Sequence, residues 1–509
     1  MASSKKWFIT SGFSPSDGNV IKPFTGGEGA WRDVLSAIVA AKESIHMAFW
    51  MMHLDHELDR TLSLEFKDPS DRQANTLHDI LIKKTQEGVR VRILLWILPT
   101  IPSTEKELLE LLDPIASIGG FLTAAAAPSV LATLDLRILK YAILRKFDVL
   151  LEPHPTHPLG SWHQKTIIVD DQIAFVGGMN AKENDWDRPF HRVFDYNRMP
   201  HSSTGAERRK LEKKRKLAEY PPRHDFMARI EGPLVTDVQN NFISRWNQAI
   251  TDKRFFSRNQ VKLFRRTLTA KGSGGKSGQI VRTMPAYPPT PMGEKGCLEM
   301  YQKAIRNAEK YIYIEDQYFR SQTIAQELAN AYVKNPKLII IVVTPPDSLA
   351  EIEWINIGFA TPSTFWTADA FKTIAKVIPD FCLFRLMAND TNASGEELYV
   401  NIDTHAKLMI VDDEWYTIGS CNINERGFLF EGEINISVND ADAFMMRKVL
   451  WTLHMKTFCP DDIVDATKLW YEHAKKNQAA KQDKKKPVSN IYPFAQNGPL
   501  LPVVPKTWF

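Results

Sequence analysis

The feature that most constrains this chain is one spaced pattern that occurs twice. Each copy reads His-x-Lys-x-x-x-x-Asp and is followed at a fixed distance by Gly-(Gly/Ser)-x-Asn. The residues are His163, Lys165, Asp170, Gly177, Gly178 and Asn180 in the first copy, and His405, Lys407, Asp412, Gly419, Ser420 and Asn422 in the second. A single His-Lys-Asp copy is expected by chance in roughly one of twenty chains of this length. The duplication therefore predicts two homologous halves.

The length of the chain agrees with two lobes. With 509 residues it exceeds what one hydrophobic core usually supports. The Gly- and Ser-rich stretch TAKGSGGKSGQ predicts a linker between the halves, and the end of the chain becomes rich in Lys and then Pro. We expect an N-terminal lobe over 1–268, a linker over 269–280, a C-terminal lobe over 281–475 and a Lys/Pro-rich tail over 476–509 that wraps the surface or frays.

Both halves show the same order of elements. An amphipathic helical pattern at 31–42 precedes a strand-like segment at 44–50, and a helix face at 298–308 precedes a strand at 311–314. The runs 89–97 and 338–343 are apolar and β-branched without alternation, as in strands buried on both faces. The motif strands are expected at 166–169 and 408–411. This order predicts an α/β fold of two homologous sandwich lobes, related by a pseudo-two-fold axis with the active site between them.

Composition indicates a soluble globular protein. Apolar residues make up 44% and charged residues 24%, and a net charge of +4 is too small to indicate a nucleic-acid binder. The four cysteines, Cys297, Cys382, Cys421 and Cys459, contain no Cys-x-x-Cys pair, so we expect small buried hydrophobes rather than disulfides.

Targeting signals are not evident. Residues 1–10 are not followed by an apolar run, so we expect no signal peptide. The uncharged segment 114–134 is interrupted by Gly119, Gly120 and Pro128, so we expect a buried helix pair or surface hairpin rather than a transmembrane helix. Localisation is left open, with non-classical export or peripheral membrane association as options.

The repeated motif offers phosphodiester chemistry. Side chains two residues apart on a strand project from the same side, so each His and its Lys face one spot. Two such pairs give an anion site in which one imidazole attacks phosphorus and the other protonates the leaving oxygen. The lysines, with amide donors from Asn180 and Asn422, would neutralise the phosphoryl oxygens. The scheme requires no metal ion and no cofactor.

A nucleophilic imidazole also needs a carboxylate on its other nitrogen. In the first half Asp225 is the candidate, with Asp195 as competitor; in the second half Glu433 is the candidate, with Glu431 as competitor.

The remaining motif residues support the site rather than act in it. The aspartates Asp170 and Asp412 end their strands, so they are assigned to an adjoining turn or a salt bridge. The glycines Gly177, Gly178 and Gly419 are assigned to turns or close packing, and Ser420 stands with them as structural support.

At these residues the chain resembles the phospholipase D superfamily, whose signature is the doubled His-x-Lys-x-x-x-x-Asp motif. Segments 186–194 (WDRPFHRVF), 224–247 and 315–319 (EDQYF) look like the flanks of this motif in phospholipases D of bacteria and plants, and a bacterial phospholipase D is the expectation. The resemblance implies a covalent phosphatidyl-histidine on His163, protonation of the headgroup by His405, and resolution by water or an alcohol. It also implies that no calcium is needed.

The resemblance implies an enzyme that hydrolyses the distal phosphodiester of phosphatidylcholine or phosphatidylethanolamine to phosphatidate, with transphosphatidylation, at a membrane or micelle interface. We expect a monomer and no nucleic-acid partner. The alternatives are a nuclease or nucleic-acid phosphodiesterase on the same scaffold, a secreted antibacterial lipase effector with the same chemistry, and a non-catalytic protein that binds anionic membranes.

Three further features carry two interpretations each. The basic segment 207–216 is either a solvated, mobile helix or a contact with anionic headgroups. The apolar segment 114–150, which has no counterpart in the family pattern, is either core and packed surface or, over 115–134, a membrane wedge. Four tryptophans either pack in the core or line a groove for acyl chains: Trp50, Trp96, Trp186 and Trp354.

Overall fold

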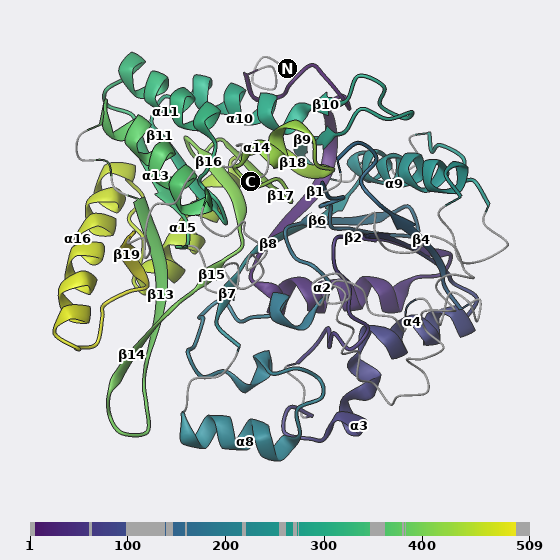
Figure 1. Ribbon diagram of the computed structural model, residues 1–509, viewed down its shortest axis with the longest axis horizontal. Helices are drawn as coiled ribbons and strands as arrows, with labels where there is room; N and C mark the ends of the chain where they lie inside the picture. The colour runs from purple at the N-terminus through teal and green to yellow at the C-terminus, as the bar shows by residue number, and fades with distance from the viewer. Residues whose placement is uncertain are drawn as a thin grey trace.

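The computed structural model describes residues 6–60, 64–97, 138, 146–157, 160–215, 220–253, 261–267, 272, 274–346, 362–378, 381 and 383–494. Two mixed β-sheets form the centre of this part of the chain, and helices cover them (Figure 1). Each sheet is built mainly from one half of the sequence and carries one copy of the repeated motif.

The first sheet has the strand order β4-β3-β2-β5-β6-β8-β1. Its strands are β1 (Ser16–Thr25), β2 (Ser44–Phe49), β3 (Arg90–Trp96), β4 (Asp148–Glu152), β5 (Thr166–Val169), β6 (Ile173–Gly177) and β8 (Phe226–Glu231). β2, β3 and β4 are parallel, and the other neighbours are antiparallel. β3 is buried along its length after Arg90, as its continuous apolar run predicts.

The second sheet repeats this path and adds one strand, in the order β19-β13-β12-β11-β16-β17-β18-β9. Its strands are β9 (Lys276–Met284), β11 (Tyr311–Asp316), β12 (Ile339–Val343), β13 (Leu383–Thr391), β16 (Lys407–Val411), β17 (Trp415–Gly419), β18 (Glu433–Asn439) and β19 (Ile491–Pro493). β11, β12 and β13 are parallel, like β2, β3 and β4. The prediction of two homologous α/β lobes is confirmed by this repeated topology.

The two sheets are joined rather than separate. β1 pairs with β8 of the first sheet and with β9 of the second. One hydrophobic core fills the space between the sheets and includes α9 (Leu234–Thr251), α15 (Asp442–Met455) and α16 (Ile463–Gln482). The largest side chains there are fully buried, among them Trp246, Trp451 and Trp470. The lobes therefore share a core, and the motif strands β5 and β16 lie at the centres of their sheets.

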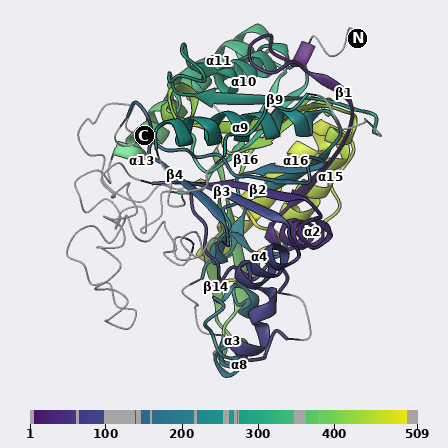
Figure 2. The ribbon, with the colours of Figure 1, turned by 90° about the vertical axis from the view of Figure 1, so that its right-hand side faces the viewer.

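The outer face of each sheet is covered by its own helices. α2 (Gly27–Ala40) and α4 (Leu77–Gln86) pack on the first sheet, and α10 (Gly296–Asn307), α11 (Gln322–Lys334) and α13 (Pro362–Ala375) pack on the second. Figure 2 shows α10 and α11 at one end of the molecule, with α2 and α4 on the opposite side of the strands. The shorter elements are α3 (Pro69–Arg72), α8 (Gly205–Lys214), α14 (Glu425–Leu429), β7 (Arg223–His224), β10 (Glu294–Lys295), β14 (Glu397–Asn401) and β15 (Asp403–Thr404).

The linker predicted for 269–280 extends too far. β9 already begins at Lys276, and Ser277 and Gly278 pair with Asn439 and Val438 of β18. A Cβ at Gly278 would lie 2.8 Å from a side-chain carbon of Leu234, so this glycine serves close packing. Glycine and serine content alone therefore cannot separate a linker from a closely packed strand.

The tail predicted for 476–509 begins too early. α16 continues to Gln482, and β19 then pairs with β13 of the second sheet. The buried side-chain amide of Asn477 donates hydrogen bonds to the carbonyl oxygens of Ser489 and Ile491, at 3.1 and 2.8 Å. The chain is thus part of the second lobe as far as Phe494, because the β13–β19 pairing and the Asn477 side chain both hold the segment after α16 in place.

The basic segment 207–216 falls largely in α8. The helix begins with a capping box between Thr204 and Glu207, and the Arg208 side chain is buried against the carboxylate of Glu57 at 3.1 Å. At least one basic residue of this segment therefore stabilises the fold.

The described ranges contain no helix that is both long and apolar enough to cross a membrane. Segment 114–134 and Trp354 lie outside the described residues, as does most of 114–150. Cys297, Cys421 and Cys459 are free and buried, as expected, whereas Cys382 is outside the described part.

Candidate active site

The two motifs occupy equivalent positions in the two sheets. His163 and Lys165 lie directly before β5, and His405 lies two residues before Lys407, the first residue of β16. Lys165 and Lys407 are 1% and 0% exposed, and His405 is 6% exposed. The strand starts therefore place both His-Lys pairs in a deep, largely desolvated position.

Each motif histidine is paired with a carboxylate from the other lobe. Nδ1 of His163 lies 3.0 Å from Oε1 of Glu433, which begins β18. Nδ1 of His405 lies 2.7 Å from Oδ2 of Asp225, which follows β7. In both pairs the carboxylate takes the Nδ1 side of the ring, so Nε2 remains for chemistry.

The backbone enforces this crossed pairing. The N–H of His163 donates to the carbonyl oxygen of Gly432 at 2.8 Å, and the N–H of His405 donates to that of His224 at 2.7 Å. In each case the acceptor directly precedes the carboxylate that holds the ring. Neither lobe alone therefore supplies both the motif histidine and the carboxylate that holds it.

The competing carboxylates are engaged elsewhere. Asp195 accepts a hydrogen bond from the N–H of Asn197 at 2.9 Å, as the cap of a short helical turn. Glu431 pairs with Arg426 at 2.6 Å and accepts from the hydroxyl of Ser161 at 2.8 Å. The structure places Asp225 and Glu433 on the motif histidines.

The lysines are held by their own motifs. Nζ of Lys165 donates to the carbonyl oxygen of His163 at 2.5 Å, and Nζ of Lys407 donates to that of His405 and to Oε1 of Gln317, the latter at 3.1 Å. An ammonium retains donors beyond these, so both lysines can still contact an anion.

The motif asparagines end the same turns. Oδ1 of Asn180 accepts from the N–H of Met51 at 3.3 Å. Oδ1 of Asn422 is buried and has no hydrogen-bond partner among the described residues. The two asparagines therefore occupy equivalent positions along the chain, but their hydrogen-bond contacts differ.

The residue two positions before each asparagine touches the crossed carboxylate. A Cβ at Gly178 would lie 2.3 Å from Oδ1 of Asp225, so this position must be glycine. Its counterpart Ser420 donates its hydroxyl hydrogen to Glu433 and accepts from the N–H of Ile434 at 3.0 Å. The shorter Asp225 thus lies against a glycine, and the longer Glu433 against a serine.

Gly177 and Gly419 pack against the neighbouring strand. A Cβ at Gly177 would lie 2.5 Å from the carbonyl oxygen of Phe226, and one at Gly419 would lie 2.4 Å from that of Ile434. These contacts are close packing between β6 and β8 and between β17 and β18.

The motif aspartates hold strand starts. The carboxylate of Asp170 accepts from the backbone N–H groups of Lys42, Glu43 and Ser44 at 2.7–2.8 Å, just where β2 begins. The carboxylate of Asp412 accepts from three N–H groups at 2.7–2.8 Å where β11 begins, those of Glu309, Lys310 and Tyr311. Both aspartates have positive φ, 52° and 57°, which Asp tolerates in a tight turn.

Burial shifts the ionisation of the site. It lowers the pKa of His163 and of His405 well below the ordinary value, and neighbouring cationic side chains act in the same direction. It raises the pKa of Asp225 to about 7 and that of Glu433 well above its usual range. It also lowers the pKa of Lys165 to about 7. The imidazoles are therefore uncharged bases in the free protein, while the His405–Asp225 pair keeps a proton up to about neutral pH.

Aromatic side chains border the first histidine. The ring of half-buried Trp50 meets that of His163 edge to face at 5.8 Å and stacks on Trp96 at 5.6 Å. Trp186, by contrast, is fully buried in the core under α2. Of the predicted tryptophans, Trp50 and Trp96 therefore lie next to the site.

Sequence reasoning missed two supporting aspartates. Asp185 accepts from the N–H of Asn180 at 2.5 Å and pairs with Arg223 at 2.6 Å. Asp316 accepts from the N–H of Ile423 at 3.1 Å. Each lies against the turn that carries a motif asparagine. The EDQYF segment contains Asp316, so its likeness to family flanks was the available signal.

Each half of the chain matches a family model. Residues 135–284 match the family model described as "Phospholipase D", and residues 301–450 match the one described as "Cardiolipin synthase, PLD-like domain". The first range contains the His163 motif and the second contains the His405 motif.

Curated relatives match most of the chain. It is 25% identical over 485 residues to "Phospholipase D A" of Dictyostelium discoideum, which covers 86% of this chain and 34% of that protein. It is 26% identical over 519 residues to "Phospholipase D beta 2" of Arabidopsis thaliana, covering 78% and 51%, and 24% identical over 523 residues to "Phospholipase D alpha 1" of Nicotiana tabacum, covering 79% and 60%. The chain thus spans about a third to three fifths of the length of these relatives.

Among solved structures, the phosphatidylserine synthase of Haemophilus influenzae Rd KW20 aligns with 91% of this chain and 94% of its own, at 13% identity and a TM-score of 0.47.

Proposed function

The chain belongs to the phospholipase D superfamily, and we propose that it is a phospholipase D that hydrolyses the distal phosphodiester of glycerophospholipids to phosphatidate and a free alcohol. Phosphatidylcholine and phosphatidylethanolamine are the proposed substrates, met at a membrane or micelle surface by a monomer. The observation that carries the proposal is the crossed pairing of two histidine–carboxylate pairs beside two buried lysines.

The first step would use His163 as the nucleophile. Glu433 on Nδ1 leaves the lone pair of Nε2 free to attack phosphorus, and it stabilises the positive charge that develops on the ring. The bond from phosphorus to the headgroup oxygen breaks, and His405 gives that oxygen a proton. The product is a phosphatidyl group on His163 and a released alcohol.

The second step would reverse the role of His405. Now a base, it takes a proton from water, whose oxygen attacks phosphorus and breaks the N–P bond to His163. An added alcohol can replace water, which gives transphosphatidylation. Asp225 keeps the His405 ring oriented in both steps.

The phosphoryl oxygens would contact Lys165 and Lys407. Both ammonium groups are almost completely buried, so their field acts in a medium of low dielectric constant. Removal of one such donor typically lowers the rate by about 100 to 1000-fold.

Three observations support a lipid rather than a nucleic acid as substrate. The ring of Trp50 borders His163 and is backed by the stacked ring of Trp96, and the curated relatives are named phospholipases D. The small net charge of +4 gives little general attraction to a polyanion.

The experiment is a comparison of the wild type with His163→Ala and His405→Ala on phospholipid vesicles. Each variant should lose at least about 1000-fold in turnover, because each removes a reacting group, while circular dichroism and the melting temperature stay as in the wild type. Substantial activity in either folded variant contradicts the two-histidine scheme. Cleavage of labelled single-stranded DNA without lipid hydrolysis contradicts the substrate class.

A further inference from the structure

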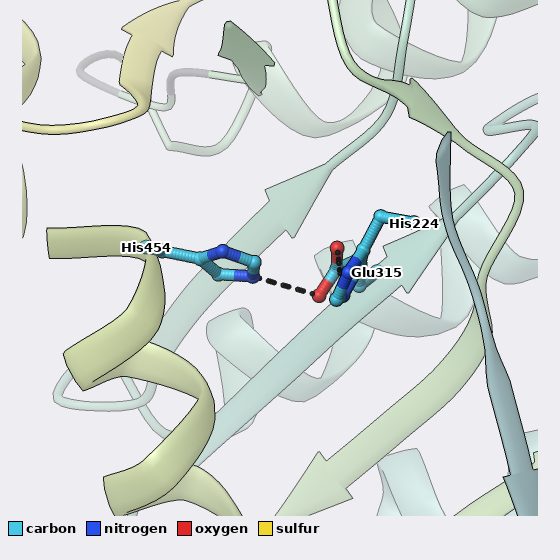
Figure 3. Close-up of side chains that lie close together, drawn as sticks. All are labelled: His224, Glu315 and His454. Carbon is cyan, nitrogen blue, oxygen red and sulfur yellow. Dashed lines mark hydrogen bonds and ion pairs between the residues drawn. The ribbon is translucent and has the colours of Figure 1, made fainter. Parts of the chain in front are cut away.

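A second group of buried histidines lies behind the candidate active site. His224 of β7, Glu315 of β11 and His454 of α15 point toward one another (Figure 3). They are 1%, 0% and 1% exposed, and one ligand atom from each lies within 4.8 Å of the others. The proposed phosphodiester chemistry uses none of these side chains.

We propose that His224 Nε2, the Glu315 carboxylate and His454 Nε2 bind a divalent transition-metal ion of the Zn²⁺ class. Two imidazoles and one carboxylate are a donor set that such ions prefer over Mg²⁺ or Ca²⁺, which take oxygen ligands. The site goes beyond the proposed function, since the ion has a structural role and does not touch the substrate.

The first argument is a pair of buried atoms without hydrogen bonds. His224 Nε2 and Glu315 Oε1 lie 3.3 Å apart, and neither has a hydrogen-bond partner among the described residues. His454 Nε2 makes a hydrogen bond with Glu315 Oε2 at 3.2 Å, which a bound ion would replace. Two ligands held at 2.0–2.1 Å in a tetrahedron are about 3.4 Å apart, close to both distances. A small approach of the two imidazoles completes the arrangement.

The second argument is the set of contacts behind His224. Its Nδ1 lies 2.8 Å from Nε2 of His191, whose Nδ1 lies 3.0 Å from Oδ2 of Asp187. If each neutral ring donates toward Asp187, His224 Nε2 keeps a lone pair that faces the Glu315 carboxylate. Two lone pairs repel at this distance, and a cation between them removes the repulsion. Histidine ligands of metals usually donate their other N–H in this way.

The third argument is charge. The ion pairs of Glu315 among the described residues are with these two histidines, and its other contact is the Tyr313 hydroxyl, which donates to Oε2 at 2.9 Å. Asp187, which lies at the other end of the His224–His191–Asp187 series of contacts, already forms an ion pair with Arg198, with Nη1 at 3.0 Å from Oδ1. A buried carboxylate is stabilised by positive charge close to it, and an ion between the two imidazoles would supply that charge at the Glu315 end.

The position of the three ligands gives the ion a structural role. Glu315 and His454 belong to the second lobe, and His224 comes from the first-half segment β7, which pairs with β15. The carbonyl oxygen of His224 accepts the N–H of His405, and the next residue, Asp225, holds the His405 ring. The ion would therefore fix the segment that positions the proposed general acid.

The experiment measures metal in the whole protein. The wild type, His454→Ala and Glu315→Gln are produced in zinc- or cobalt-supplemented medium, and metal content is determined by inductively coupled plasma mass spectrometry. The wild type should hold about one ion per chain after gel filtration, and the cobalt form should show visible absorption of nitrogen and oxygen ligation. Both variants should lose at least about tenfold in metal content. His473→Ala, outside the cluster, should keep it.

The opposite results overturn the proposal. A wild type that carries no ion after either supplementation, or a His454→Ala variant with unchanged metal content, means that a shared proton fills the gap between His224 and Glu315. If the variants fail to fold, X-ray absorption of the zinc-loaded wild type decides, because two imidazoles and a carboxylate must appear around the ion. Lipid hydrolysis is assayed separately, so failure of the metal site leaves the proposed function standing.

Discussion

At the residue scale, the site depends on which carboxylate holds which ring. Glu433 of the second half holds His163, and Asp225 of the first half holds His405. The two pairs differ in length, and Gly178 and Ser420 differ accordingly at their equivalent positions. Each ring is therefore fitted to its own carboxylate, and the pairs should respond separately to mutation.

Replacement of either carboxyl group by an amide should slow turnover without unfolding the protein. Glu433→Gln and Asp225→Asn keep the size of the side chain but can stabilise the wrong tautomer of the ring, so we expect kcat to fall by about 100 to 10,000-fold. Steady-state kinetics on phospholipid micelles and the melting temperature measure the two effects.

Glu431→Gln and Asp195→Asn are matched controls. Their carboxylates contact Arg426 and the N–H of Asn197 instead of a motif histidine, so kcat should stay within about fivefold of the wild type. If a control variant loses as much activity as its partner, the assignment of the carboxylates is wrong.

The pH profile should have its steep limb on the alkaline side. Burial brings the pKa of Lys165 down to about 7 and that of Asp225 up to about 7, so both the ammonium charge and the proton of the His405–Asp225 pair are lost as pH rises through 7. The pKa of His163 is lowered well below its ordinary value, so the nucleophile stays unprotonated at pH 6. We expect kcat/KM on a soluble phosphodiester to be highest near pH 6 and, because two protons are lost, to fall by up to roughly a hundredfold per unit well above 7.

Circular dichroism across the same pH range controls for unfolding. A value of kcat/KM that rises from pH 6 to 8.5 would contradict these ionisation states.

The sequence could predict the motif residues and the two candidate carboxylates, but not that each carboxylate holds the histidine of the other half. The His-Lys spacing is local, since strand geometry alone puts both side chains on one side. The crossing of Asp225 and Glu433 depends on how the two sheets pack, and no local spacing encodes that. The same holds for His224, Glu315 and His454, which meet only in the folded chain.

At the element scale, the close contact between the end of β6 and the start of β8 fixes the position of the Asp225 carboxylate. Gly178 follows β6 and lies against Asp225, which directly precedes β8. A methyl group at Gly178 would have to displace the carboxylate, because its carbon would lie 2.3 Å from Oδ1, far below van der Waals distance. A residue of the first motif thus controls the histidine of the second.

Gly178→Ala should therefore impair the function of His405, although the two residues belong to different motifs, because it displaces the Asp225 carboxylate. We expect at least about a tenfold fall in kcat with a smaller change in KM, because the Asp225 carboxylate loses its place on Nδ1. Kinetics and the nitrogen-15 chemical shifts of the His405 ring report the effect.

Gly275→Ala is the control, since a Cβ there meets nothing within 4 Å. Equal activity of Gly178→Ala and the wild type would show that Asp225 is not aimed by this contact.

Elements were predictable where burial is strong. The continuous apolar runs located β3 and β12 to within a residue or two, because strands buried on both faces tolerate few polar residues. The boundaries of the linker and tail were not predictable, because Gly278 and Asn477 serve long-range contacts that look like flexible or polar sequence.

At the scale of the whole molecule, the duplicated motif has a physical reason to lie in one chain. The two sheets share one core and are joined through β1, which holds the lobes in a fixed relation. Because each half supplies the carboxylate for the other, the site exists only when both lobes are folded together. The duplication in the sequence predicted the two lobes, and the repeated strand order confirms them.

The central claim is a phosphatidyl group carried by His163, and the most direct measurement is an alcohol trap. The protein is incubated with mixed phospholipid vesicles and ethanol, without added metal, and the products are identified by mass spectrometry. We predict phosphatidylethanol together with phosphatidate, in a ratio that rises with ethanol, and neither product from His163→Ala. Phosphatidate without phosphatidylethanol at any ethanol concentration would contradict a transferable intermediate, and the absence of both products would contradict the lipid substrate.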